Sequence, residues 1–186
     1  MAKIFVFRHG QTQYNKDKIF TGWDDPDIND AGIRECREVA EKLKNVTPTR
    51  AYTSDLKRAQ HTLYIVLGEK KDKIPVVVDK RIKERSYGIL TRKSKTETEK
   101  TYPKEFPLWH RSYDVAPPNG ESIKDVEKRV LSFLDDIIPQ LKKDDIVFIS
   151  AHGNSLRPIR RYFEKISIDE MCSFEHTPAK VYEYTV

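Results

Sequence analysis

The sequence predicts an α/β fold, a three-layer sandwich with a mostly parallel central sheet flanked by helices. Residues 2–7 (AKIFVF) and 146–151 (IVFISA) are short, nearly continuous apolar runs. Such runs are typical of parallel strands whose two faces are both covered by helices. Between them, helical patterns alternate with further strand-like runs, which favours an α/β sandwich over an antiparallel barrel.

Two amphipathic helices are expected in the first half of the chain. In 30–44 the apolar residues recur at helical spacing, and either Asn29 or Asp30 can act as the N-cap. Residues 55–67 repeat this pattern and stop at Gly68, as at a helix C-cap. Both helices should therefore pack one apolar stripe against the sheet.

The second half of the chain predicts a third helix that begins near Ser122. Its apolar stripe runs from Ile123 to Leu141, so Pro139 would strain only the last turn. Segment 92–120, rich in Lys, Thr, Glu and Pro, predicts short helices plus a loop that pass over the functional edge of the sheet. Further strands are expected at 50–53 (RAYT), 75–79 (PVVVD) and 180–185 (KVYEYT).

Length and composition predict one domain spanning 1–186, because 186 residues can bury a sizeable core. Hydrophobic residues make up 38% and charged residues 34% of the chain, a balance typical of soluble proteins. No apolar stretch approaches the roughly 20 residues of a membrane helix, and the N-terminus shows no signal-peptide core. We therefore expect a cytoplasmic protein without a membrane partner.

The two cysteines and the net charge limit the kinds of ligand that the protein is expected to bind. Cys36 and Cys172 lie far apart, with no partner at metal-binding spacing, and are interpreted as small buried thiols. The net charge of +5 would suit nucleic acid, an anionic small substrate or simply a basic surface. Because no RNA-binding signature and no uninterrupted Lys/Arg block is present, we expect no nucleic-acid partner.

Two of the expected strands end in the same way. Arg8-His9-Gly10 follows the first strand, and His152-Gly153-Asn154 follows the strand at 146–151. Ligands of open parallel sheets bind in the crevice beyond the carboxyl ends of the strands. One histidine there would more often be structural, but two histidines, one with a flanking arginine, predict a functional site.

Arg58 adds a third cationic signal. It lies in "TSDLKRAQHT" (Thr53 to Thr62), in the first turn of a helix that follows a strand. A guanidinium offers donors in a rigid fork that matches the oxygens of a phosphate. Alone it could be a solvated surface cation, but with Arg8, His9 and His152 it favours an anion site.

Arg-His-Gly after the first strand, with the second His-Gly, resembles the histidine phosphatase superfamily. Six further motifs are present: "FTGW" (Phe20 to Trp23), "ERSYG" (Glu84 to Gly88), "KSKTETEKTYP" (Lys93 to Pro103), "LWHRSYD" (Leu108 to Asp114), "ESIKD" (Glu121 to Asp125) and "AHGNSLR" (Ala151 to Arg157). With these motifs the chain resembles, more closely, the cofactor-dependent phosphoglycerate mutases, from Lys3 to about Tyr184. The resemblance implies a phosphoglycerate mutase-like fold and a role in glycolysis and gluconeogenesis.

The resemblance also implies catalytic roles. His9 would become phosphorylated, which agrees with its chemistry, since a neutral imidazole with a free Nε2 is a competent nucleophile. Arg8, Arg58 and His152 would cradle the phosphate, and Glu84 would be the general acid/base, its alternative being a surface glutamate paired with Arg85. 2,3-Bisphosphoglycerate would prime the enzyme, and no metal is expected.

Substrate binding is assigned in the same way. Lys95 and Arg111 are the discriminating pair, because a mutase must hold a substrate that is anionic at both ends. For Lys95 a solvated charge is the alternative. The full set implied to bind phosphate and carboxylate is Asn15, Thr21, Gly22, Tyr87, Lys95, His110, Arg111, Gly153 and Asn154.

The chain departs from the family pattern at several positions. His110 stands where these mutases usually have a second arginine, so it would replace that cation only if protonated, and Arg92 replaces a usual glycine. The loop between Asp114 and Glu121 is short and the familiar C-terminal tail is missing. In relatives these two segments cover the site and form subunit contacts, so we expect a site that is accessible to solvent. The sequence leaves the oligomeric state undecided, with a homodimer as one alternative.

The sequence therefore allows three alternative functions. The leading one is interconversion of 3-phosphoglycerate and 2-phosphoglycerate through a phosphohistidine. The second is a phosphohistidine-dependent phosphatase that hydrolyses small phosphomonoesters, because an open site admits water. The third is a basic, non-catalytic binding protein, which is disfavoured because every catalytic residue type is present.

Overall fold

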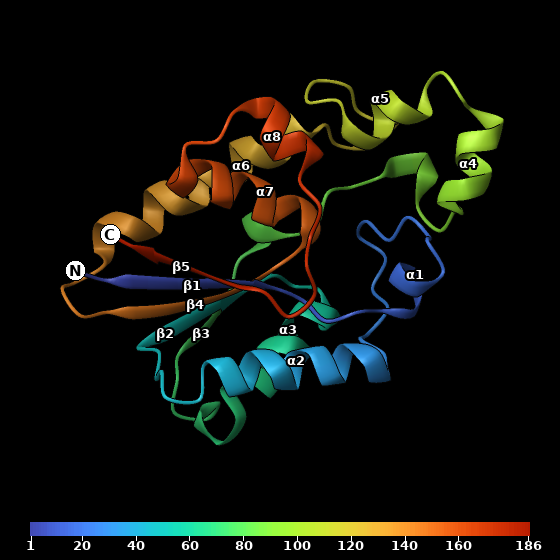
Figure 1. Ribbon diagram of the computed structural model, residues 1–186. Coiled ribbons are helices and arrows are strands. Elements are labelled where there is room, and N and C mark those ends of the chain that lie inside the picture. The colour runs from blue at the N-terminus through green and yellow to red at the C-terminus, as the bar shows by residue number, and fades with distance from the viewer.

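The computed structural model describes residues 1–186 and is built on one five-stranded sheet with the order β3-β2-β4-β1-β5 (Figure 1). Strands β1 to β4 are parallel, and β5 runs antiparallel to β1. The predicted fold class is thus confirmed, and each predicted strand is present within one residue at either end. The strands are β1 (Lys3–Arg8), β2 (Arg50–Thr53), β3 (Val76–Val78), β4 (Ile146–Ala151) and β5 (Val181–Thr185).

Helices cover both faces of the sheet (Figure 1). α6 (Ile123–Ile137), α7 (Gly153–Glu164) and α8 (Ile168–Ser173) lie on one side, and α2 (Asp30–Lys42) and α3 (Lys57–Leu67) lie on the other. Successive side chains of β1 point to opposite faces, as the period of a strand requires. Ile4 and Val6 join the core beneath α6 and α7, whereas Phe5 and Phe7 join the core against α2 and α3.

The predicted helix ends hold with small shifts. Asn29, rather than Asp30, caps α2 by accepting from the Gly32 N–H, and Gly68 ends α3 with a φ of 55°. Ser122 forms a capping box at the start of α6. The expectation that this helix continues into a strained last turn is wrong: α6 ends at Ile137, and 138–140 forms a 3₁₀ turn around Pro139, which has no N–H to donate. Other 3₁₀ turns lie at 68–70, 80–82 and 88–90.

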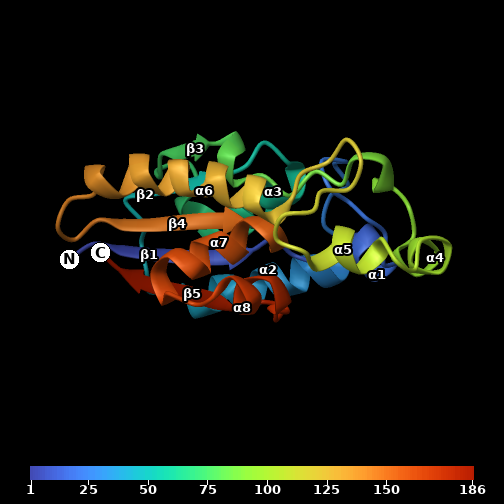
Figure 2. The same ribbon diagram turned by 90° about the horizontal axis from the view of Figure 1, so that it is seen from above.

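The segment predicted to pass over the functional edge does lie beyond the carboxyl ends of the strands, opposite the two chain termini (Figures 1 and 2). It forms α4 (Lys95–Thr101) and α5 (Phe106–Arg111), next to α1 (Gln13–Lys16). A small core of Phe20, Tyr87, Leu90 and Phe106 holds it in place. It thereby brings Lys95 and Arg111, at the ends of two helices, to this edge. No helix is both long and apolar enough to cross a membrane.

Candidate active site

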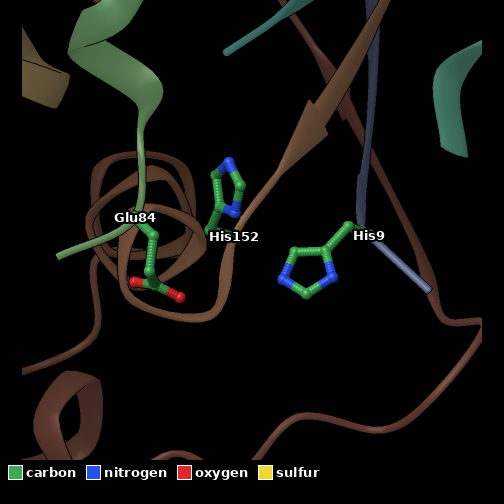
Figure 3. Close-up of side chains that lie close together, drawn as sticks. All are labelled: His9, Glu84 and His152. Carbon is green, nitrogen blue, oxygen red and sulfur yellow. The ribbon is translucent and has the colours of Figure 1, made fainter. Parts of the chain in front are cut away.

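The two strand-end histidines meet. β1 and β4 are neighbours in register, with Arg8 opposite Ala151, so both chains leave the sheet at one place. The ring centroids of His9 and His152 lie 5.0 Å apart. Figure 3 shows both rings beside the Glu84 carboxylate, which comes from a separate loop.

His9 is held as a neutral imidazole. Its side chain is only 5% exposed, and Nδ1 lies 2.7 Å from the carbonyl oxygen of Gly10. Because a carbonyl can only accept, Nδ1 carries the hydrogen and Nε2 keeps its lone pair. Burial, followed by the charges of Arg58 and Arg8, lowers the pKa of His9 well below 6.5. The imidazole is therefore neutral at neutral pH, and its Nε2 lone pair is of the kind that can act as a nucleophile.

The glycine after His9 is required by close packing. A Cβ on Gly10 would lie 2.5 Å from the carbonyl oxygen of Gly32 in α2. The Gly10 N–H donates to Thr62 Oγ1 at 3.0 Å. These contacts fix the backbone that orients the His9 ring.

His152 is buried and is positioned by Ser54, which was not among the predicted site residues. Ser54 Oγ lies 2.7 Å from His152 Nε2, while Nδ1 has no partner within the protein. Burial and the charge of Arg58 lower the pKa of His152 as well. Ser54 belongs to the same motif as Arg58, Thr53 to Thr62, so the sequence pattern could have indicated it.

Glu84 is buried, at 7% exposure, which removes the interpretation as a surface glutamate. Its Oε1 accepts from the Arg85 N–H at 2.7 Å and from the backbone and side-chain N–H groups of Asn154 at 3.1 and 3.0 Å. The Asn154 amide also donates to the Tyr87 hydroxyl at 3.0 Å. Oε2 has no such donor, so it is the oxygen free to exchange a proton with a ligand.

Arg58 is buried and does not line the pocket. Its guanidinium donates to the carbonyl oxygens of Asp24 and Gly22, both at 2.8 Å, and the residue is only 1% exposed. Two donors of the fork thus hold the 22–24 backbone, while Nε has no partner within the protein. The charge of Arg58 still acts on the site, because it is a main cause of the lowered His9 pKa after burial.

One pocket of about 330 Å³ gathers most of the predicted residues. All the predicted site residues line it except His152, Arg58 and His110. Those that do are Arg8, His9, Asn15, Thr21, Gly22, Glu84, Tyr87, Lys95, Arg111, Gly153 and Asn154. Partial burial and the Arg111 charge lower the pKa of Lys95, so this lysine is not a freely solvated cation.

His110 faces an aromatic cluster rather than the pocket. Its ring packs against Phe106, with centroids 5.1 Å apart, and against the edge of Phe20 at 6.2 Å. Burial and the Arg111 and Lys95 charges lower its pKa to about 3. His110 is therefore neutral, and the expectation that its protonated ring replaces the missing arginine does not fit this placement.

The pocket also contains polar residues that the sequence did not assign: Gln11, Glu35, Arg157, Glu175 and His176. Arg157 is the last residue of the "AHGNSLR" motif, so this motif could have indicated it as a site residue. It donates to the carbonyl oxygens of Met171 and Cys172 at 2.6 and 3.0 Å. Glu175 and His176 come from a connecting segment with no motif.

His9, Glu84 and His152 are also residue types that bind metals, with one potential ligand atom from each within 4.8 Å of the others. Tetrahedral zinc ligands would lie about 3.3 Å apart, given bonds of roughly 2.0 Å. The nearby arginine charges oppose a cation and favour an anion.

Comparisons with known proteins agree with this geometry. A sequence model described as "Histidine phosphatase superfamily (branch 1)" matches residues 4–186. A 2,3-bisphosphoglycerate-dependent phosphoglycerate mutase of Nitrobacter winogradskyi is 41% identical over 177 residues, 92% of this chain and 86% of the relative. A phosphoglycerate mutase of Schizosaccharomyces pombe is 39% identical over 177 residues, 92% of this chain and 84% of that one.

Solved structures give the same fold. The structure described as Bacillus stearothermophilus YhfR has a TM-score of 0.90 at 26% identity and covers 100% of this chain and 92% of its own. A mycobacterial glucosyl-3-phosphoglycerate phosphatase in complex with VO3 has a TM-score of 0.86 at 23% identity, covering 97% and 91%. The second similarity concerns the fold alone.

Proposed function

The chain belongs to the histidine phosphatase superfamily, and on that basis we propose that it is a phosphoglycerate mutase that uses 2,3-bisphosphoglycerate. It interconverts 3-phosphoglycerate and 2-phosphoglycerate through a phosphohistidine at His9. Relatives that carry this name match about nine tenths of the chain.

The observation that carries the proposal is the supply of cations to one pocket from two parts of the chain. Arg8 arrives from the strand edge with His9, and Lys95 and Arg111 arrive from the helices beyond it. A phosphatase needs a pocket for one phosphate only. A ligand that is anionic at both ends explains why the second pair is present.

The residues support transfer in both directions. His9 Nε2 attacks phosphorus, so that the N–P bond forms while the P–O bond breaks, and Glu84 Oε2 supplies the proton that the leaving oxygen needs. In the return step Glu84 takes the proton of the acceptor hydroxyl as its oxygen attacks the phosphoryl group on His9. Arg8 and Arg58 contribute positive charge where the transferred oxygens become more negative.

2,3-Bisphosphoglycerate supplies the phosphoryl group that primes His9. The pocket fits such a polyanion, since Arg8, Lys95, Arg111 and Arg157 all line it. The chemistry assigned to these residues needs no metal, because their fixed charges stabilise the transferred group. Tyr87 and Asn154 contribute by holding Glu84 in place.

The test is an assay of the purified protein with 3-phosphoglycerate, with and without 2,3-bisphosphoglycerate. We expect 2-phosphoglycerate formation that the bisphosphate stimulates, with little release of inorganic phosphate. Phosphate release without stimulated 2-phosphoglycerate formation would identify a hydrolytic phosphatase instead. Lys95→Ala should reduce mutase activity much more than hydrolysis of p-nitrophenyl phosphate, which has no second anionic group.

A further inference from the structure

The segment 174–180 links α8 to β5 and forms one wall of the pocket. In Figure 1 it descends from α8 past the carboxyl ends of the strands before it enters β5. Glu175, His176, Pro178 and Ala179 of this segment line the pocket. Of these, His176 has a side chain whose hydrogen-bonding capacity is unused.

Neither ring nitrogen of His176 makes a hydrogen bond of normal geometry, although both are shielded from solvent, and the Gly153 backbone interacts with the ring only weakly. A buried donor or acceptor left unpaired lowers stability, and native proteins rarely retain one without a reason. Both nitrogens belong to a ring at the wall of the active-site pocket. A ligand in that pocket can therefore supply the missing partner.

The ring is also held in place. Phe174 packs against it edge to face, with centroids 4.8 Å apart, and the Arg160 guanidinium lies 3.8 Å from the centre of the Phe174 ring. The next residue back, Glu175, is bound to Arg111. The packing of Phe174, rather than the exposed Glu175–Arg111 pair, therefore determines the position of the His176 ring.

The space that His176 faces is part of the reaction site. A Cβ built on Gly153 would lie 3.3 Å from His176 Nε2 and 3.5 Å from Glu84 Oε2. The imidazole and the proposed acid/base thus border the same space beside a glycine. A side chain at position 153 would fill that space.

Cations surround the same point. Burial, followed by the charges of Arg8, Arg157 and Arg111, lowers the pKa of His176 to about 2, with the Gly153 backbone acting in the opposite direction. The ring is therefore neutral and offers one N–H donor. Between these arginines an anionic oxygen is the natural acceptor.

We propose that His176 is a further substrate-binding residue, whose neutral ring donates a hydrogen bond to an anionic oxygen of the bound phosphorylated ligand. This inference rests on the proposed function for the identity of the ligand. The charges of Arg8, Arg157 and Arg111, which act on the same ring, would attract that oxygen as well. The hydrogen bond from His176 also gives the 174–180 segment a role in specificity, because the segment supplies the donor.

The experiment compares His176→Phe and His176→Gln with the wild type by calorimetry, using 3-phosphoglycerate and vanadate as separate probes. Phenylalanine keeps a ring against Phe174 but removes both nitrogens, whereas glutamine keeps an N–H near the Nε2 position. We expect His176→Phe to weaken 3-phosphoglycerate binding about tenfold or more, and His176→Gln to stay within about threefold of the wild type. His61→Ala, which changes an exposed histidine paired with Asp27, is the matched control.

Equal binding by the wild type and His176→Phe would overturn the inference. Equal weakening by both substitutions would also overturn it, because shape rather than hydrogen bonding would then matter. A failure of the proposed function would give a different result. The wild type would then bind 3-phosphoglycerate or vanadate but form no 2-phosphoglycerate. The comparison between the variants stays valid in that case.

Discussion

Arg111 donates from Nη2 to Glu175 Oε1 over 2.7 Å, so a carboxylate of the chain itself occupies the arginine proposed to bind the substrate carboxylate. The pair is partly open to solvent, with side chains 30% and 76% exposed. Exposed ion pairs contribute only about 0–1 kcal/mol. A substrate carboxylate can therefore displace Glu175, but it must compete with it.

Removing that competition should tighten substrate binding. We expect Glu175→Gln to lower the KM for 3-phosphoglycerate by about two- to fivefold, which corresponds to the loss of an exposed ion pair. The kcat should change little, because Glu175 contacts Arg111 and makes no hydrogen bond to His9 or Glu84, to which the chemistry is assigned. Steady-state kinetics at saturating 2,3-bisphosphoglycerate measure both constants.

Glu41→Gln is the matched control for that substitution. It removes the charge of a glutamate that pairs with Lys44 on the exposed surface, at the C-terminal end of α2. Its KM should equal that of the wild type. A KM that rises in Glu175→Gln would show that this carboxylate helps to hold Arg111 for the substrate rather than competing with it.

Arg58 should matter for stability as well as for catalysis. Arg58→Ala leaves the carbonyl oxygens of buried Gly22 and partly buried Asp24 without their donors, at a cost of about 2 kcal/mol in the free energy of unfolding. Arg92→Ala is the control, because Arg92 binds the Asp24 side chain from an exposed position and should cost at most about 1 kcal/mol. Urea unfolding of both variants tests this, and equal losses would contradict it.

The sequence predicted the sheet well because burial on both faces leaves a strong pattern. The run IVFISA became β4 without a change of boundary, and Asn29 and Ser122 became the caps of their helices. The six-residue α8 is too short to show a periodicity of its own. The conformation of the segments that connect these strands and helices could not be predicted from the sequence.

The same contrast applies to the site. His9 and His152 could be placed together from the sequence, because neighbouring parallel strands end at one edge. The neutral state of His110 could not, since it depends on packing against Phe20, far away in the chain. His176 was missed because a single histidine in a connecting segment carries no motif, and only the fold brings it to Gly153.

Buried neutral histidines should make the protein sensitive to acid. The folded-state pKa values of His9, His110, His152 and His176 are all lowered, whereas unfolded histidines titrate near 6.5. Below about pH 6.5 the unfolded state therefore binds more protons than the folded state, so the free energy of unfolding falls as pH falls. Each such group contributes up to about 1.4 kcal/mol per pH unit.

His110→Phe isolates one of these contributions. The substitution removes a group whose folded pKa is about 3 and keeps an aromatic ring beside Phe20 and Phe106. Between pH 6 and pH 5 the stability of the variant should fall less steeply than that of the wild type, by about 1 kcal/mol per pH unit, since His110 is partly exposed. Urea unfolding at the two pH values measures the slopes, and identical slopes would show that His110 titrates alike in both states.

His9 provides the decisive test of the chemistry. His9→Gln removes the Nε2 lone pair that the Gly10 carbonyl holds ready, so acid-labile labelling from radioactive 2,3-bisphosphoglycerate should vanish and mutase activity should fall on the order of 10⁴-fold or more. His61→Ala, outside the pocket, should label as the wild type does. Full labelling of His9→Gln would assign the nucleophile to another residue, and His152 would be examined first, because its unpartnered Nδ1 belongs to a ring only 5.0 Å from that of His9.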